Sequence, residues 1–137
     1  MSKQPKIEFN QLEAGYQFRS VSYEMDFSMV STYLKAVEET SRLYQTTELV
    51  PPMAVAARAM AALSEGISLP SGIIHVSQEL EFIDTVCVGD TIICNAKVLR
   101  KHERGGLHLM TVGLDVFNQN QKKVLVGKTS FVLPEAR

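Results

Sequence analysis

Histidine, the side chain whose pKa best suits acid–base chemistry near neutral pH, occurs three times in the sequence. His102 and His108 flank Gly105-Gly106 and could pair around a metal ion, but no third ligand is spaced to join them. We interpret both as solvated and predict no metal site. His75 is the one histidine within an apolar stretch, where a half-exposed strand position and a ligand-contacting position both remain open.

The carboxylates and thiols that could do chemistry are also better interpreted as structural or solvent-exposed residues. Glu79 and Glu81 stand two residues apart, a spacing that suits paired carboxylates, but a solvated or interface face explains them better. Cys87 and Cys94 each fall in an apolar run, and no signal peptide implies export. We interpret the cysteines as reduced packing residues of a cytoplasmic protein.

The overall composition is that of one folded domain spanning 1–137. Of the 137 residues, 45% are hydrophobic and 21% are charged, which argues against disorder. The formal net charge of −1 provides no electrostatic footprint for nucleic acid. Neither a nucleic-acid partner nor a bound cofactor is predicted.

One apolar stretch, residues 50–66, is the element around which the others must be arranged. It begins with Pro51-Pro52, which suits the first turn of a helix, and ends at Gly66, which suits a left-handed cap. Arg58 and Glu65 are its only charges, so we expect a buried helix. At about 1.5 Å per residue it is too short to cross a bilayer, and no membrane contact is predicted.

The flanking segments predict a sheet with one further helix. Apolar positions recur at helical spacing from 29 to 37, after a capping Asp26 or Ser28, and a polar loop follows over 40–49. Residues 16–25 alternate weakly, whereas 73–83, 91–100, 107–117 and 123–133 predict strands joined mostly by tight turns. In 73–83 the alternation places His75 on the face of Glu79 and Glu81. An antiparallel meander over one buried helix is an α+β fold.

This order of elements resembles the hot-dog fold, in which a curved antiparallel sheet is wrapped around one central helix. The stretch Pro70 to Ile92 is similar to the segment after the central helix in MaoC-like hydratases and dehydratases. There, a strand that ends in an aromatic residue leads to a V-x-V/P-G-D turn, matched here by Phe82 and by Val88-Gly89-Asp90. The resemblance covers most of the chain from about residue 16 onwards.

The family's catalytic loop, D-x-N-P-L-H in active members, is matched here with substitutions. Glu39 stands at the Asp position, Ser41 at the Asn and Tyr44 at the His. The resemblance implies that Glu39 and Tyr44 take the catalytic positions and that Ser41 contacts substrate. Tyrosine, with an ordinary pKa near 10, is a poor general base where the family has histidine.

The start of the central helix is substituted as well. Active members place His-Gly there, with a backbone N–H that polarises the thioester carbonyl, but Pro52 has no N–H to donate. Met53 or Ala54 could provide the donor one position later. The resemblance further implies that Pro52, Met53 and Ala54 contact substrate. If His75 contacts a ligand, we expect it on a strand edge beside the helix start, against a thioester or phosphopantetheine arm; the alternative is a half-exposed strand residue.

The resemblance therefore implies a protein that handles acyl thioesters of coenzyme A or acyl carrier protein. The substitutions resemble those in partner subunits, or N-terminal halves, of two-component dehydratases. We expect a homodimer, or a heterodimer with a catalytic MaoC-like subunit, because the edges of a five-stranded sheet invite pairing. Two alternatives stay open: an acyl-CoA thioesterase with Glu39 activating water, and a non-catalytic binding module.

Overall fold

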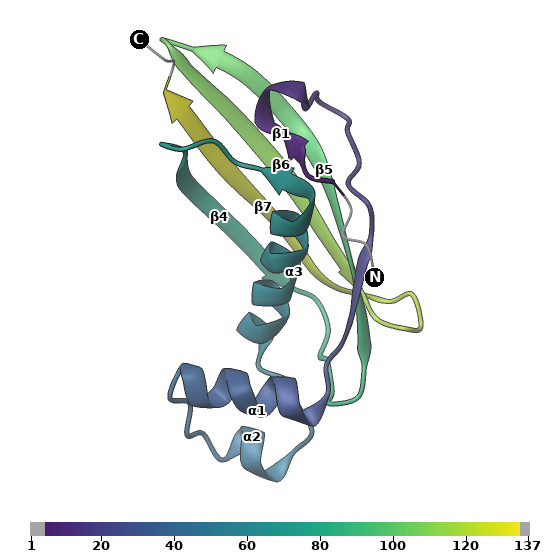
Figure 1. The fold of residues 1–137 in the computed structure, drawn as a ribbon. Coiled ribbons are helices and arrows are strands. Elements are labelled where there is room, and N and C mark those ends of the chain that lie inside the picture. The colour runs from purple at the N-terminus through teal and green to yellow at the C-terminus, as the bar shows by residue number, and fades with distance from the viewer. Residues whose placement is uncertain (1–4, 135–137) are drawn as a thin grey trace.

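The fold is a curved five-stranded antiparallel sheet with one long helix, α3, on its concave side (Figure 1). The computed structural model of the protein describes residues 5–134. In chain order the elements are β1 (Ile7–Glu8), η1 (Phe9–Gln11), β2 (Val21–Glu24), α1 (Phe27–Ala36), α2 (Leu43–Thr46), α3 (Pro52–Gly66), β3 (Ile67–Ser68), β4 (Ile74–Phe82), β5 (Thr91–Arg104), β6 (Leu107–Phe117) and β7 (Lys123–Pro134).

The strand order is β2-β5-β6-β7-β4, which differs from the meander expected for the last four strands. The hairpins β5–β6 and β6–β7 form as predicted. β4, however, pairs with β7 at one edge of the sheet and not with β5, its neighbour in the sequence. Figure 1 shows β4 and β5 on opposite sides of α3, and the segment that joins them passes near the start of this helix.

A register shift in β4 corrects the predicted alternation. Val76 is bulged out of the β4–β7 ladder between His75 and Ser77. Because a strand's side chains alternate in direction, one extra residue moves His75 to the opposite face. His75 stands opposite buried Phe131 and so shares the concave face with Leu80, not with Glu79.

The central helix begins as predicted but ends differently. Pro51 caps α3 with an extended backbone and Pro52 is its first residue. Gly66 does not adopt a left-handed conformation: it is the last helical residue, and the chain passes directly into β3. A Cβ atom at this position would lie 3.0 Å from the ring of Phe18, so any larger residue would require the ring to shift.

The helix α1 is capped at Asp26, whose carboxylate accepts the Met29 N–H at 2.8 Å. It ends at Ala36, before Glu38 takes a positive φ of 56°. The following loop, expected to be irregular, contains the single-turn helix α2. Figure 1 shows α1 and α2 together beyond the end of the sheet, next to the start of α3.

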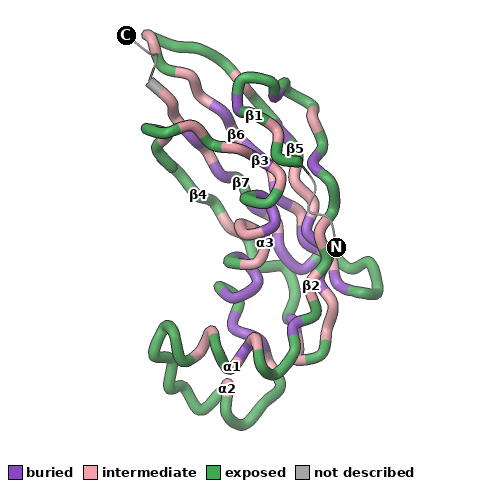
Figure 2. Tube along the Cα trace, in the orientation of Figure 1, coloured by how far each residue is buried: buried purple, intermediate pink, exposed green. Residues whose placement is uncertain are grey.

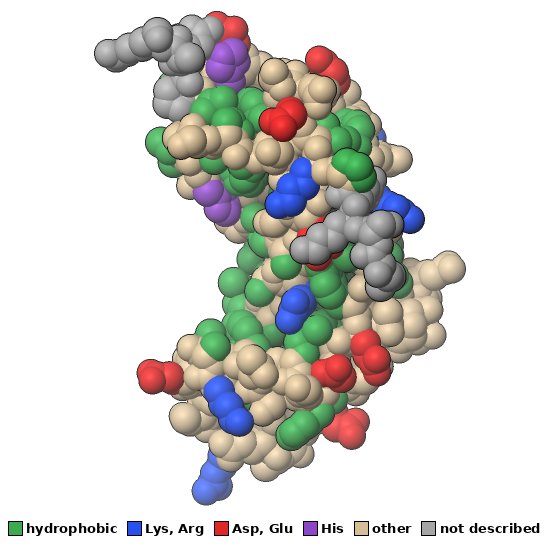
Figure 3. Space-filling model, in the orientation of Figure 1, with side chains coloured by type: hydrophobic (Ala, Val, Ile, Leu, Met, Phe, Trp, Pro, Cys, Tyr) green, Lys and Arg blue, Asp and Glu red, His purple; other side chains and the backbone are tan. Residues whose placement is uncertain are grey.

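Burial divides the molecule unevenly (Figure 2). The inner faces of β5, β6 and β7 and one side of α3 form the core, in which Ile92, Met110 and Val112 are fully buried. β4 is exposed or half-exposed along its whole length. α3 also shows an open side, where Met53 is 52% exposed, so the helix expected to be buried all round is buried on one side. Figure 3 shows hydrophobic side chains gathered over α3, where the molecule narrows.

Candidate functional site

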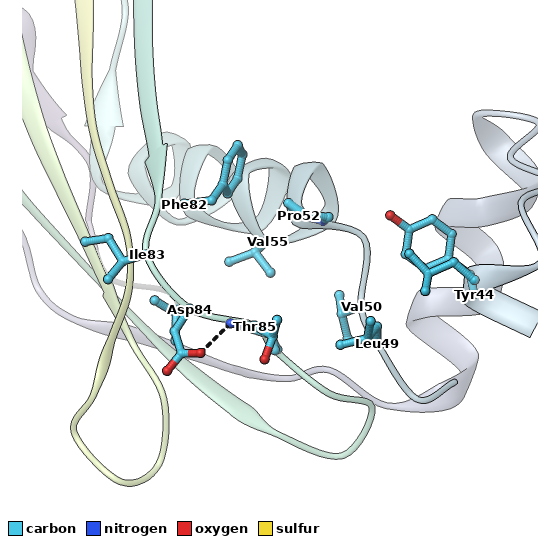
Figure 4. A pocket seen from close by; sticks show the side chains of 12 residues that line it. Tyr44, Leu49, Val50, Pro52, Val55, Phe82, Ile83, Asp84 and Thr85 are labelled. Atoms are coloured by element: carbon cyan, nitrogen blue, oxygen red, sulfur yellow. Dashed lines mark hydrogen bonds between the residues drawn. The ribbon is translucent and has the colours of Figure 1, made fainter. Parts of the chain in front are cut away.

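A cavity of about 350 Å³ lies at the start of α3, between the helix, α2 and the loop that follows β4 (Figure 4). Most of its lining is apolar. The residues that line it are Leu43, Tyr44, Leu49, Val50, Pro52, Val55, Phe82, Ile83, Asp84, Thr85, Val86 and Val124. A concave apolar site with a few polar groups is the usual form of a small-molecule site.

Two backbone contacts fix the cavity's walls relative to each other. The Val50 N–H donates to the Val86 carbonyl at 2.8 Å, and the Val88 N–H donates to the Glu48 carbonyl at 2.7 Å. These bonds attach the segment leading into α3 to the loop between β4 and β5. The helix start is therefore held against the Phe82 end of β4.

The Val88-Gly89-Asp90 turn stabilises the loop between β4 and β5, which forms one wall of the cavity. The Asp90 carboxylate accepts the Cys87 N–H at 2.8 Å through one oxygen and the Gln119 side-chain amide at 2.9 Å through the other. Gly89 has a φ of 97°, a conformation that favours glycine. This motif has a positioning role: it fixes the loop that carries Asp84 and Thr85.

Polar groups in the cavity are few. Tyr44 projects from α2 with its hydroxyl directed toward the start of α3 (Figure 4). Asp84 is exposed, and its carboxylate accepts the N–H of Thr85 at 2.8 Å. Asp84 and Thr85 were not identified from the sequence. The signal that could have found them is their position directly after the strand that ends in an aromatic residue.

The predicted catalytic loop is brought to the cavity only in part. Tyr44 lines it, whereas Glu39 and Ser41 do not. Glu39 is exposed and accepts the Ser41 N–H at 3.2 Å, and the Ser41 hydroxyl accepts the Leu43 N–H at 3.2 Å. In this chain those two side chains hold the turn that leads into α2.

At the helix start, Pro52 lines the cavity and has no N–H. The Ala54 N–H donates to the Pro51 carbonyl at 2.9 Å, so it is already engaged. The Met53 N–H has no hydrogen-bond partner among residues 5–134, but Met53 is not among the residues that line the cavity. Ala54 lines a second cavity instead.

His75 is remote from this cavity, at the opposite end of β4 from Phe82. Its Nε2 lies 2.6 Å from the Thr129 hydroxyl, and its ring centre lies 5.2 Å from that of Phe131. Thr129 is fully buried, so the imidazole provides its hydrogen-bond partner. The expected place of His75 beside the helix start is therefore not where the structure puts it.

Two further features of residues 5–134 concern metal ligands and the lengths of the helices. Within 5–134, no three His, Cys, Asp or Glu side chains are grouped so as to hold a metal ion. Over the same residues, none of the helices has the length and apolar content needed to cross a bilayer. What the site can do is bind an apolar group, with Tyr44, Asp84 and Thr85 as its polar side chains.

Comparison with known proteins gives both a family and a fold. The family model for the FAS1-like, dehydratase domain region matches residues 13–126. No curated protein sequence matches the chain.

Solved structures with the same fold are similar over most of both chains. A monoamine oxidase regulatory protein from Archaeoglobus fulgidus is 19% identical, with 100% of both chains covered and a TM-score of 0.82. R-hydratase PhaJ1 from Pseudomonas aeruginosa is 22% identical, with 96% of this chain and 88% of that one covered and a TM-score of 0.78. The HadBC complex, a 3R-hydroxyacyl-ACP dehydratase from Mycobacterium tuberculosis, is 17% identical, with 88% and 96% covered and a TM-score of 0.71. The chain therefore belongs to the FAS1-like, dehydratase-region family and has the α+β hot-dog fold that it shares with R-hydratases and MaoC-like dehydratases.

Proposed function

We propose that this chain handles acyl thioesters as a hydratase/dehydratase-like protein whose own catalytic positions are substituted, and that it serves as the partner subunit of a two-chain dehydratase. The observation that carries the proposal is the cavity at the start of α3. Tyr44 and Pro52, which stand where active relatives have histidine and glycine, both line it. The chain therefore has an apolar pocket at these positions, but it lacks the histidine and the glycine N–H on which the catalysis implied by the resemblance depends.

The cost of these replacements supports a non-catalytic role. Losing one oxyanion-hole donor lowers turnover by roughly 10²–10³-fold. Losing a positioned acid–base group costs typically about 10²–10⁴-fold more. Glu39 does not compensate, because its carboxylate is exposed and lies outside the cavity lining.

The partner role is supported by two kinds of observation. Similar folds occur in complexes named for two chains, ChsH1-ChsH2 and HadBC, both from Mycobacterium tuberculosis. In this chain, Phe82 and Ile83 at the cavity are 43% and 49% exposed. Large apolar side chains left open beside a pocket are what a second subunit would cover.

The test follows both possible reactions of one substrate. Purified protein is incubated with a crotonyl thioester of coenzyme A while loss of the double bond and release of free thiol are recorded. We expect neither from the chain alone, and we expect hydration when a MaoC-like subunit with an intact D-x-N-P-x-H loop is added. Ordinary hydratase turnover by the isolated chain would contradict the proposal.

A thioesterase is the second candidate, and one observation favours it. Asp84 is the carboxylate that lines the cavity, where it could activate a water molecule at a thioester carbonyl. Thiol release without loss of the double bond would identify this activity. Asp84→Asn should then abolish release, while Glu39→Gln, outside the cavity, should leave it unchanged.

A further inference from the structure

A second cavity, of about 260 Å³, lies between α1 and α3 and shares no lining residue with the first. Its walls are apolar: Met25 precedes α1, Met29 and Val30 come from the first turns of α1, and Ala54 comes from α3. At about 30 Å³ for a water-sized group, the space holds roughly eight such groups. The thioester site proposed above makes no use of it.

Arg58 is the charged side chain among the residues that line this cavity. It is half-buried, and its guanidinium carbon lies 5.3 Å from the centre of the Tyr23 ring. No carboxylate within residues 5–134 forms an ion pair with it. Glu65, two helical turns further along α3, interacts electrostatically with Tyr23, as Arg58 does, but forms no ion pair with Arg58. A half-buried cation that has no ion pair, in a mostly apolar wall, is suited to an anionic ligand.

Within residues 5–134 the Arg58 guanidinium has no hydrogen bond or ion pair besides its contact with the Tyr23 ring. Its planar set of N–H donors matches a carboxylate in a bidentate pair. A phosphate, with its higher charge, would favour a second cation. Lys35 is the other basic residue on α1, and helical spacing places it away from Met29 and Tyr33, which line the cavity.

We propose that this cavity binds a linear acyl chain that ends in a free carboxylate, with the chain between α1 and α3 and the carboxylate on Arg58. The site goes beyond the proposed function, because it needs neither a thioester nor a second subunit. Two sources supply this chemistry: a free medium-chain fatty acid, or the far end of a dicarboxylic acid joined to its carrier through the other end. Methionine side chains suit such a ligand because they adapt to a flexible chain.

The test uses the purified chain with ¹³C-labelled methionine methyl groups, octanoate as the ligand and 1-octanol as its uncharged match. Octanoate should shift the methyl resonances of Met25 and Met29 and leave that of Met110, in the sheet core, in place. Arg58→Met should weaken octanoate binding about 10- to 100-fold, the usual size of a charge-assisted hydrogen bond. The weak binding of 1-octanol should stay unchanged, and Arg100→Met, on β5, should behave as the parent does.

Three results would overturn the proposal: equal affinities for octanoate and 1-octanol, full octanoate affinity in Arg58→Met, or shifts confined to other methionines. If Arg58→Met does not fold, Ala57→Leu replaces it, since it narrows the cavity and keeps the arginine. Octanoate affinity undiminished in Ala57→Leu would count against the site.

A competition experiment separates the two sources. Displacement of octanoate by the mono-thioester of suberic acid identifies a carrier-bound acyl group, and no displacement identifies a free fatty acid. Equal displacement by octanoyl-CoA, which has no free carboxylate, would contradict the role of Arg58. Because the readout is two methyl groups between α1 and α3, it is independent of whether crotonyl thioester is hydrated at the first cavity.

Discussion

Tyr44 and the proline pair at the start of α3 suggest a restoration experiment at the scale of single residues. Tyr44→His with Glu39→Asp gives the loop the residue types that the proposed function assigns to active relatives, and Pro51→His with Pro52→Gly gives the helix start an N–H at position 52. Neither double variant should hydrate crotonyl-CoA, because groups that act as one unit in catalysis are strongly non-additive. The fourfold variant should show measurable hydration.

The fourfold variant should be slightly less stable than the parent, and one outcome would contradict the prediction. Asp at position 39 can still accept the Ser41 N–H, as Asx turns do. Pro52→Gly loosens the unfolded chain and should lower the free energy of unfolding by about 0.4–1 kcal/mol. A fourfold variant that folds and binds the acyl thioester, but hydrates none of it, would show that the alignment of the two motifs is mistaken.

The buried thiol of Cys94 makes the stability of the protein depend on pH. Burial raises the pKa of its thiol from the ordinary 9.0 to about 12. The folded protein therefore keeps this proton over a range in which the unfolded chain loses it. The stabilisation is fully present below pH 9 and is lost as the pH rises toward 12. Between pH 9 and 10.5 this amounts to about 2 kcal/mol.

Urea unfolding of the parent and of Cys94→Ala at pH 8 and pH 10.5 tests this linkage. The variant lacks the thiol, so its free energy of unfolding should fall less than that of the parent over the same interval. The stability advantage of the parent should shrink by about 2 kcal/mol. Parallel loss in both proteins would mean that Cys94 is not held neutral.

At the scale of elements, Gly127 in β7 decides how closely β4 can pair. A Cβ atom there would lie 2.9 Å from the Glu79 carbonyl oxygen, a backbone atom that cannot move without shifting β4. Gly127→Ala should lower the free energy of unfolding by about 1–3 kcal/mol. Amide hydrogen exchange should also accelerate along β4.

Gly113 in β6 is the matched control. A Cβ atom there would lie 3.0 Å from the end of the Leu99 side chain, which can rotate away. Gly113→Ala should therefore cost less than Gly127→Ala in urea unfolding. Equal losses would mean that the tight packing of β4 on β7 contributes little.

The elements also show what local sequence can and cannot determine. Asp26 as a helix cap and the Gly105-Gly106 hairpin were predictable, because caps and tight turns depend on neighbouring residues. The place of β4 at the far edge was not, because no local signal says which strand it will join. The same holds for the bulge at Val76 and for Gly66, whose role depends on the ring of Phe18.

In the candidate site, too, some residues could be identified from the sequence and others only from the structure. The motif match brought Tyr44 and Pro52 to attention, and both line the cavity. Asp84 emerged from the tertiary arrangement, since its place at the cavity depends on where the loop after β4 lies. For the helix-start donor the sequence offered Met53 or Ala54, and the structure shows that the Ala54 N–H is already bonded to the Pro51 carbonyl. The motif match therefore pointed to two residues of the cavity wall, and the three-dimensional arrangement added Asp84 and Thr85.

At the scale of the whole molecule, β4 and the start of α3 both expose apolar side chains. β4 pairs with β7 on one side and, within residues 5–134, with no strand on the other. Ile74 and Val76 on this edge are 55% and 50% exposed, and Met53 on α3 is 52% exposed. Unpaired, apolar edge strands associate unless they are protected, so we expect the chain to be at least a dimer.

A charge on the β4 edge should prevent that association. The double variant Ile74→Lys, Val76→Lys keeps the intramolecular ladder to β7 but places cations on the open edge, which natural sheets use to block pairing. Light scattering at micromolar concentration should give a monomer near 15.2 kDa for this variant and a larger mass for the parent. Ser22→Lys on β2, at the opposite edge of the sheet, is the matched control and should keep the parent's mass. A parent that is itself monomeric would mean that β4 tolerates its open edge, and the association expected of this fold would then require a different partner chain.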